Sequence, residues 1–143
     1  MAEPLSGTAR AAIAADARAR WPNESCGLLF DSGRYLPLDN VSSRPSQAYE
    51  LDPAALLAAL AQAGQTGETL HAIVHSHTAS PPEFSSEDRA MALTEDGRPL
   101  WPGVRHLIVA ARQRGVGEGK LYCWDGGARL FREEQVIDFS VEF

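Results

Sequence analysis

Two histidines separated by a single residue, His75 and His77, have the spacing of a metal-binding pair. They end the stretch 70–77, which is rich in branched apolar residues and precedes a Ser/Pro-rich segment, as in a buried strand. Side chains alternate between the two faces of a strand, so both imidazoles point the same way from Cα atoms roughly 6.6 Å apart. The strand therefore predicts two ligands for one ion at its C-terminal end.

A third candidate ligand follows the turn that contains Pro81 and Pro82. Ser85 is a capping residue with acids and helix formers behind it, which predicts a helix to about Thr94 with Asp88 in its first turn. Two imidazoles and a carboxylate leave a tetrahedral zinc with one open position for water, as in catalytic sites. The Ser85-x-x-Asp88 spacing also fits a capping box, in which the acid bonds to backbone instead. Both interpretations stay open from sequence.

These residues resemble the signature of the JAMM metalloproteases, the catalytic form of the MPN domain. After His75-x-His77 come seven residues, then Ser85, two more residues and Asp88. An upstream glutamate followed by Cys-Gly and apolar residues belongs to the same signature, and Glu24 fits it. The resemblance covers most of the chain.

The family resemblance also implies a fold. Family members have an α/β fold of the cytidine deaminase-like kind, so we expect residues 1–143 to form a single catalytic domain with a mixed β-sheet between helical layers. Thr78 is a departure, because many members have proline after the second histidine. It supplies no ligand, so the metal site stays intact while the geometry of the turn stays open.

The resemblance further assigns roles in hydrolysis. Glu24 would act as the general base for a zinc-bound water, and Ser85 would donate a hydrogen bond to the oxyanion. From the residues alone, Glu83 and Glu87 are equal candidates for the base, and the resemblance selects Glu24. The residues that would bind Zn²⁺ are His75, His77 and Asp88.

Family members cleave peptide or isopeptide bonds after the C-terminal tail of ubiquitin or ubiquitin-like proteins. This short chain is similar to the compact prokaryotic members, so the expected substrate is a ubiquitin-like or sulfur-carrier protein ending in Gly-Gly. Two alternatives stay open, a metal-free MPN scaffold domain and a zinc amidohydrolase or deaminase that acts on a small molecule. Deaminases of the related fold use His-x-Glu with paired cysteines, which this sequence lacks.

Composition narrows the remaining function classes. The 143 residues are 44% hydrophobic, which is enough for the core of one domain. Thirteen basic against nineteen acidic residues give a net charge of −6, which argues against a nucleic-acid partner. No apolar run approaches the ~20 residues that span a membrane, so we expect a cytoplasmic protein. The oligomeric state and the native metal among zinc, iron and cobalt stay open.

The other elements follow from apolar patterns and turn residues. A helix is predicted over 6–20, ended by Trp21 and Pro22, and a second over 54–63 behind the capping Asp52 and Pro53. Two strands, 26–30 and 35–38, suggest a hairpin. Later strands are predicted at the following ranges: 106–110, 120–124, 129–131 and 136–143.

The cysteines, the other two histidines and Trp101 are expected to lie outside the metal site. Cys26 and Cys123 are too few for a disulfide framework and are expected to be reduced and buried, with a nucleophilic Cys26 as the alternative. His71 and His106 are expected to be structural. Trp101 is expected to pack on the core, although a loop so near the site could touch substrate.

Overall fold

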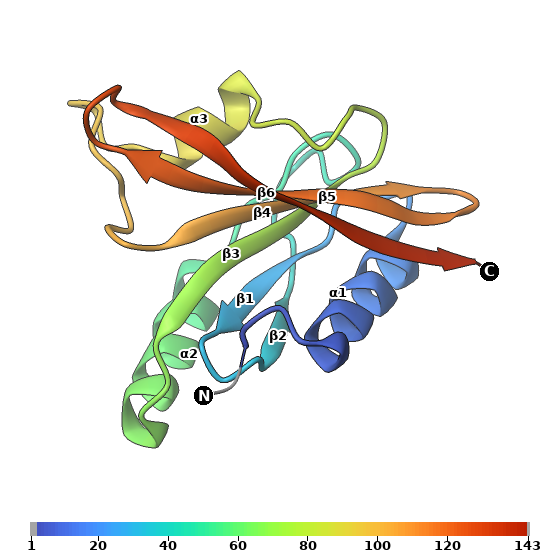
Figure 1. The fold of residues 1–143 in the computed structure, drawn as a ribbon, viewed down its shortest axis with the longest axis horizontal. Helices are drawn as coiled ribbons and strands as arrows, with labels where there is room; N and C mark the ends of the chain where they lie inside the picture. The colour runs from blue at the N-terminus through green and yellow to red at the C-terminus, as the bar shows by residue number, and fades with distance from the viewer. Residues whose placement is uncertain (1–2, 143) are drawn as a thin grey trace.

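A six-stranded sheet with the order β2-β1-β3-β4-β5-β6 forms the centre of the computed structural model, which describes residues 3–142 (Figure 1). Strands β3 and β4 run parallel, and the other neighbouring pairs run antiparallel. The strands are β1 (Cys26–Phe30), β2 (Tyr35–Leu38), β3 (Leu70–His77), β4 (Arg105–Arg112), β5 (Gly115–Asp125) and β6 (Leu130–Glu142). The helices are α1 (Gly7–Arg20), α2 (Pro53–Thr66) and α3 (Ser86–Ala92).

Helices α1 and α2 cover opposite faces of this sheet. Ile13 and Ala17 of α1 belong to one buried cluster, which includes Val74 of β3. Leu56 of α2 belongs to a second cluster, which includes the neighbouring β3 residue Ile73. Successive strand residues point to opposite faces, so the two clusters lie on the two sides of the sheet. The predicted mixed sheet between helical layers is confirmed.

Local capping explains where the two long helices begin. The Ser6 hydroxyl accepts a hydrogen bond from the N–H of Ala9 at the start of α1, and Asp52 accepts one from Ala54 at the start of α2. These side chains satisfy N–H groups that have no partner within the helix. Helix α2 continues to Thr66, three residues past its predicted end, and Gly67 ends it in a left-handed conformation.

The C-terminal part of the sheet corrects one sequence prediction. The separate strands predicted at 129–131 and 136–143 are one strand, β6, which pairs with β5 along its length. Polar residues 132–135 interrupt the apolar alternation, but backbone pairing does not require apolar side chains at a sheet edge. The register of the β5–β6 pair shifts at two points, between Val116 and Glu118 and between Leu121 and Tyr122. The predicted strand 136–143 extends into residues 141–143, whose side chains lie outside the described part of the chain.

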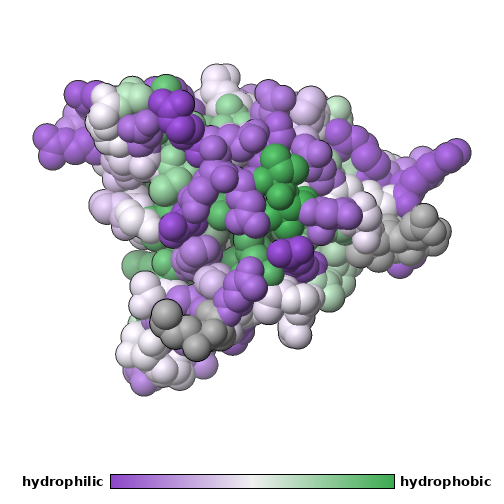
Figure 2. All heavy atoms as spheres, in the orientation of Figure 1, coloured by the Kyte–Doolittle hydropathy of each residue, from purple (hydrophilic) through white to green (hydrophobic). Residues whose placement is uncertain are grey.

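The surface is largely polar. The face seen in Figure 2 is mostly purple, with green hydrophobic residues gathered near its centre. Among residues 3–140, the large hydrophobic side chains that are exposed are Val41, Leu57, Met91, Leu100 and Val136. No helix within the described part of the chain is long and apolar enough to cross a membrane.

Candidate metal centre

The C-terminal end of β3 buries both histidines in the middle of the sheet. His75 pairs with Cys26 of β1 on one side and with Ile108 of β4 on the other. The exposed fraction is 0% for His75 and 4% for His77. Because the two side chains lie two residues apart on one strand, they share a face of the sheet. The sheet thus holds two imidazoles side by side, away from water.

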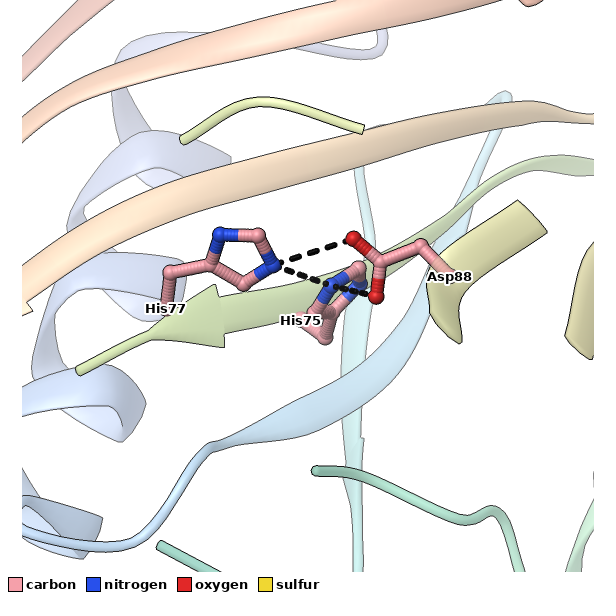
Figure 3. Close-up of side chains that lie close together, drawn as sticks. All are labelled: His75, His77 and Asp88. Carbon is pink, nitrogen blue, oxygen red and sulfur yellow. Dashed lines mark hydrogen bonds and ion pairs between the residues drawn. The ribbon is translucent and has the colours of Figure 1, made fainter. Parts of the chain in front are cut away.

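Helix α3 brings a carboxylate to the same point. The Nε2 atom of His75 lies 3.1 Å from Asp88 Oδ1, and the Nε2 atom of His77 lies 3.0 Å from Asp88 Oδ2. The two Nε2 atoms are 3.3 Å apart. Figure 3 shows the three side chains pointing toward one another from β3 and α3. Within the described residues, these three form the group of potential metal ligands, with ligand atoms within 4.8 Å of one another.

The capping box and the convergence on the histidines occur together. The Ser85 hydroxyl accepts a hydrogen bond from the N–H of Asp88 at 3.1 Å, and Asp88 Oδ2 accepts one from the N–H of Ser85 at 3.0 Å. The box fixes the rotamer of Asp88, and the fixed carboxylate faces the imidazoles. The two interpretations that the sequence left open are therefore compatible. The helix itself ends at Ala92, slightly before its predicted end.

The hydrogen bonds of His77 determine which of its nitrogens faces the cluster. Its Nδ1 lies 2.7 Å from the carbonyl oxygen of Pro81, so Nδ1 carries the hydrogen and donates it. In neutral His77 the lone pair is then on Nε2, beside the other acceptors. Arg112 holds the same turn by donating to the carbonyls of His77 and Ser80, at 3.0 and 2.8 Å. A carbonyl partner of this kind orients a metal-binding imidazole.

These distances fit a bound cation. Acceptor atoms that face one another at about 3 Å are favourable only with a proton or a cation between them. Two nitrogens bound to one tetrahedral zinc at its usual bond length are about 3.3 Å apart, which the two Nε2 atoms match. His75 differs from His77 in this respect, because its buried Nδ1 has no hydrogen-bond partner in the described residues. The Tyr49 ring stacks on His75 with centroids 4.1 Å apart.

Electrostatics favour a neutral His75 and an ionised Asp88, whereas His77 is protonated more readily than a free imidazole. Burial lowers the pKa of His75. Burial also opposes charge on His77, but hydrogen bonds to Asp88 and Pro81 outweigh it and raise the pKa of that imidazole. For Asp88, burial favours the neutral acid, but hydrogen bonds from the two histidines hold its pKa well below the usual range. A carboxylate that stays ionised next to imidazole nitrogens is a donor set suited to a divalent metal.

Glu24 lies next to this cluster without joining it. Its side chain is buried, with 5% exposed, and burial raises its pKa to about 7, a shift that nearby His77 opposes and nearby Asp88 reinforces. The alternatives Glu83 and Glu87 are exposed. Of the three glutamates that the sequence offered as a base, the structure therefore buries only Glu24 beside the imidazoles.

Ser85 combines a cap with an accessible hydroxyl. Its oxygen accepts the hydrogen bond from Asp88, which leaves its own hydrogen free to donate. The residue is exposed to solvent at the start of α3. Ser85 can thus donate to a molecule that approaches the cluster.

Residues that the sequence did not single out hold the backbone of Glu24. The Glu24 carbonyl accepts a hydrogen bond from Asn40 Nδ2 at 3.0 Å, and the next N–H, that of Ser25, donates to Ser76 Oγ at 2.8 Å. Strand alternation puts the Ser76 side chain on the face opposite to the two histidines, so the sequence alone assigns it no part in the metal site. The sequence feature that could have pointed to Ser76 is its position between two candidate ligands on a buried strand. Nothing in the local sequence marked Asn40.

An apolar hollow of about 470 Å³ lies beside the cluster. Tyr49, which stacks on His75, forms part of its wall, and Trp101 lines it while also packing against the core on the α2 side. The two interpretations of Trp101 are thus not exclusive. Three of the exposed apolar side chains from different elements line the same hollow: Leu57, Met91 and Leu100.

The remaining histidines and cysteines lie outside the cluster. His106 is buried with its ring edge-on to the neighbouring rings of Phe84 and Phe131, and burial lowers its pKa to about 4. His71 lies at the other end of β3, half-buried. Both cysteines are free, and burial raises the pKa of Cys26 to about 12, which disfavours the thiolate that a nucleophile requires.

Comparison with known proteins identifies the family. The sequence matches the Prok-JAB family, described as prokaryotic homologs of the JAB domain, over residues 8–120. The chain belongs to this family. The predicted resemblance to compact prokaryotic JAMM/MPN proteins is therefore confirmed.

Two relatives of this Prok-JAB protein have names that bear on function. A desampylase of Haloferax volcanii is 34% identical over 121 residues, which cover 80% of this chain and 78% of that protein. Tail tip assembly protein K of Escherichia phage N15 is 35% identical over 147 residues, which cover 92% of this chain and 58% of that protein. The chain thus spans little more than half the length of the phage protein.

Solved structures share the fold of the Prok-JAB chain. The solution structure of protein DSY2949 from Desulfitobacterium hafniense has a TM-score of 0.67 and 27% identity, and the match covers 91% of this chain and 88% of that one. A protein from Salinibacter ruber has a TM-score of 0.58 and 22% identity over 88% of this chain and 84% of that one. The second match supports the fold alone.

Proposed function

We propose that this protein is a zinc-dependent peptidase or isopeptidase that cleaves the bond after the C-terminal tail of a ubiquitin-like or sulfur-carrier protein. The observation that carries the proposal is the convergence of His75, His77 and Asp88, two imidazoles and a carboxylate from separate elements, on one buried point. The 34% identity with a desampylase supports it. Residues 1–143 would act as one catalytic domain.

His75 and His77, through their Nε2 atoms, and the carboxylate of Asp88 would hold the metal. A bound Zn²⁺ supplies a water ligand with a pKa near 7 and polarises a carbonyl oxygen. Three protein ligands leave room for such a water, whereas structural zinc sites use four. This ligand count favours a catalytic site over a structural one.

Glu24 and Ser85 would act on the reacting groups. The Glu24 carboxylate accepts the proton of the attacking water and then donates it to the leaving amine. A pKa of about 7 suits both steps, since the group can hold or release a proton near neutral pH. The Ser85 hydroxyl donates a hydrogen bond to the oxygen of the scissile carbonyl as that oxygen becomes negative. Ser85 is exposed at the start of α3, and Glu24 is buried beside the imidazoles.

The Gly-Gly tail of the proposed substrate fits what surrounds the cluster. Glycines have no side chains, so an extended Gly-Gly tail can lie close to the protein backbone and be held by backbone hydrogen bonds. The apolar hollow lined by Tyr49, whose ring stacks on His75, offers a place for a larger side chain nearby.

The experiment is incubation of zinc-loaded protein with carrier proteins that bear C-terminal extensions or lysine-linked adducts, followed by mass measurement of the products. Hydrolysis after the Gly-Gly tail that a chelator stops, and that added zinc restores, is the expected result. Peptide and isopeptide substrates in parallel decide the preference between the two bonds. Hydrolysis that persists in chelator would contradict the metal mechanism.

A second candidate is a binding role in assembly without hydrolysis. The phage relative, 35% identical and named as a tail tip assembly protein, favours it. Uncleaved carrier that nevertheless binds to metal-loaded protein would support this candidate. The buried Glu24, which a scaffold does not need, favours the enzyme.

A further inference from the structure

The antiparallel pairing of β1 with β3 changes its hydrogen bonding beside the candidate metal centre. The last pair of the ladder is Cys26 with His75, and Ser25 and Ser76 lie opposite each other just beyond it. The N–H of Ser76 donates to the Ser25 carbonyl at 3.0 Å, as in a regular ladder. The N–H of Ser25 donates to Ser76 Oγ at 2.8 Å, although a regular pair would use the backbone carbonyl. A side chain thus replaces a main-chain acceptor where the chain leaves the sheet.

The peptide group between Glu24 and Ser25 is consequently held at both ends by side chains. Its carbonyl accepts from Asn40 Nδ2 at 3.0 Å, and its N–H donates to Ser76 Oγ at 2.8 Å. The N–H of Glu24 itself donates to the Pro45 carbonyl at 2.7 Å. These bonds fix the backbone on both sides of the Glu24 Cα atom, and with it the direction of the side chain.

Burial makes the contribution of Ser76 hard to replace. Ser76 is 0% exposed and Ser25 is 2% exposed, so water has little access to the Ser25 N–H. Without the hydroxyl, that N–H would be buried and unpaired, and the chain would have to shift to satisfy it. The shift would begin one residue from the Glu24 carboxylate.

We propose that Ser76 is a positioning residue that holds Glu24 in place for proton transfer, an inference that rests on the proposed function of Glu24 as the base. Ser76 stands between His75 and His77, with its side chain on the opposite face of β3. One strand therefore carries two candidate ligands on one face and the support of the base on the other. A movement of β3 carries the two ligands and the supporting hydroxyl together, so Glu24 keeps its position relative to the cluster.

The test compares Ser76→Ala and Ser76→Thr in the native protein and in a Glu24→Gln background. A displacement of the base of about 1 Å lowers kcat on the order of 100-fold, so Ser76→Ala should lower kcat strongly while KM and bound zinc stay unchanged. Ser76→Thr, which keeps the hydroxyl, should restore most of kcat. In the Glu24→Gln background, Ser76→Ala should cause no additional loss, because the group that it positions is already absent.

The matched control is Ser32→Ala, which removes a hydroxyl bonded to Glu68 and Arg34 at the surface. It should leave kcat unchanged. Zinc lost together with activity in Ser76→Ala, or an additive loss in the double variant, would overturn the proposal. A thermal melt separates either result from failure to fold.

Amide hydrogen exchange tests the same contact without turnover. The Ser25 amide should exchange slowly in the native protein and much faster in Ser76→Ala, while the His75 amide stays protected. Equal Ser25 exchange in both proteins would overturn the proposal. If Glu24→Gln retained full hydrolysis, the proposed base would be wrong, and the exchange result would still show whether Ser76 holds the peptide.

Discussion

Strand β3 has a polar cluster at each end, and the two clusters differ in burial. At the C-terminal end, His75, His77 and Asp88 are almost completely buried. At the N-terminal end, Glu68 forms a salt bridge with Arg34 at 2.9 Å at the surface. Both clusters join a carboxylate to nitrogen groups at similar distances, so residue type alone does not separate them.

The comparison shows how burial changes the pKa values and the use of a carboxylate paired with nitrogen groups. Hydrogen bonds from Arg34 and Ser32 lower the pKa of Glu68 to about 2, yet solvent screens the charges and such a pair contributes little to stability. Burial lowers the pKa of His75 and so preserves a lone pair inside the sheet. The buried cluster is therefore suited to a cation, whereas the surface cluster only fastens a turn to a strand.

The strongest test of this contrast is Asp88→Ala. Because the change removes one of three candidate ligands, we expect zinc affinity to fall by more than about 100-fold. This exceeds the loss that is typical when a residue that only hydrogen-bonds to a metal ligand is changed. Metal analysis after dialysis and a calorimetric titration measure it. The change also removes part of the α3 cap, so Ser85→Ala, which disturbs the cap but keeps all three candidate ligands, is the control for zinc binding. Full zinc retention in Asp88→Ala would leave Asp88 as a cap only.

Glu24→Gln should keep the metal and lose hydrolysis. The amide cannot accept a proton, so kcat is expected to fall by about 10²- to 10⁴-fold. Single-turnover cleavage of a carrier fusion, together with zinc content, separates the two effects. Loss of zinc in this variant would make Glu24 a ligand instead of a base.

Ser85→Ala should have a smaller effect on the same reaction. Loss of one oxyanion donor lowers kcat by about 10²- to 10³-fold, and loss of an N-cap costs about 1 kcal/mol of stability. Kinetics and a urea melt measure the two separately. A destabilised variant with native kcat would restrict Ser85 to the capping role.

The rate should depend on pH through Glu24. Its pKa is raised to about 7, so the carboxyl gains a proton as the pH falls and can no longer act as a base. A bound cation would lower that pKa, which places the acid limb of kcat/KM at or below about pH 7, with a tenfold loss for each further pH unit. A value of kcat/KM that rises as the pH falls below 7 would contradict this assignment.

The smallest effect is expected from the surface cluster. Glu68→Gln should leave zinc binding and kcat unchanged and lower the thermal midpoint only slightly. The folded-state pKa of Glu68 is depressed, so its contribution to stability is present above about pH 4.5 and disappears as the pH falls toward 2. Thermal melts of both proteins at pH 7 and at pH 3 should therefore differ more at pH 7. A large change in kcat would show that the two ends of β3 are coupled.

Much of the candidate site follows from local sequence periodicity. The two-residue repeat of a strand puts His75 and His77 on one face, and the capping pattern puts Asp88 three residues after Ser85. Both rules act within one element, so the sequence was sufficient to predict them. The same holds for the helices, since their caps lie within a few residues of their ends.

The sequence by itself could not decide how distant segments meet. It left Glu24, Glu83 and Glu87 as equal bases until the family resemblance was considered, because burial depends on packing between elements far apart in the chain. The support that Ser76 gives to the Glu24 backbone joins residues about fifty positions apart. Only the tertiary structure could bring these groups together, since desolvation and hydrogen bonding at that range are set by the folded sheet.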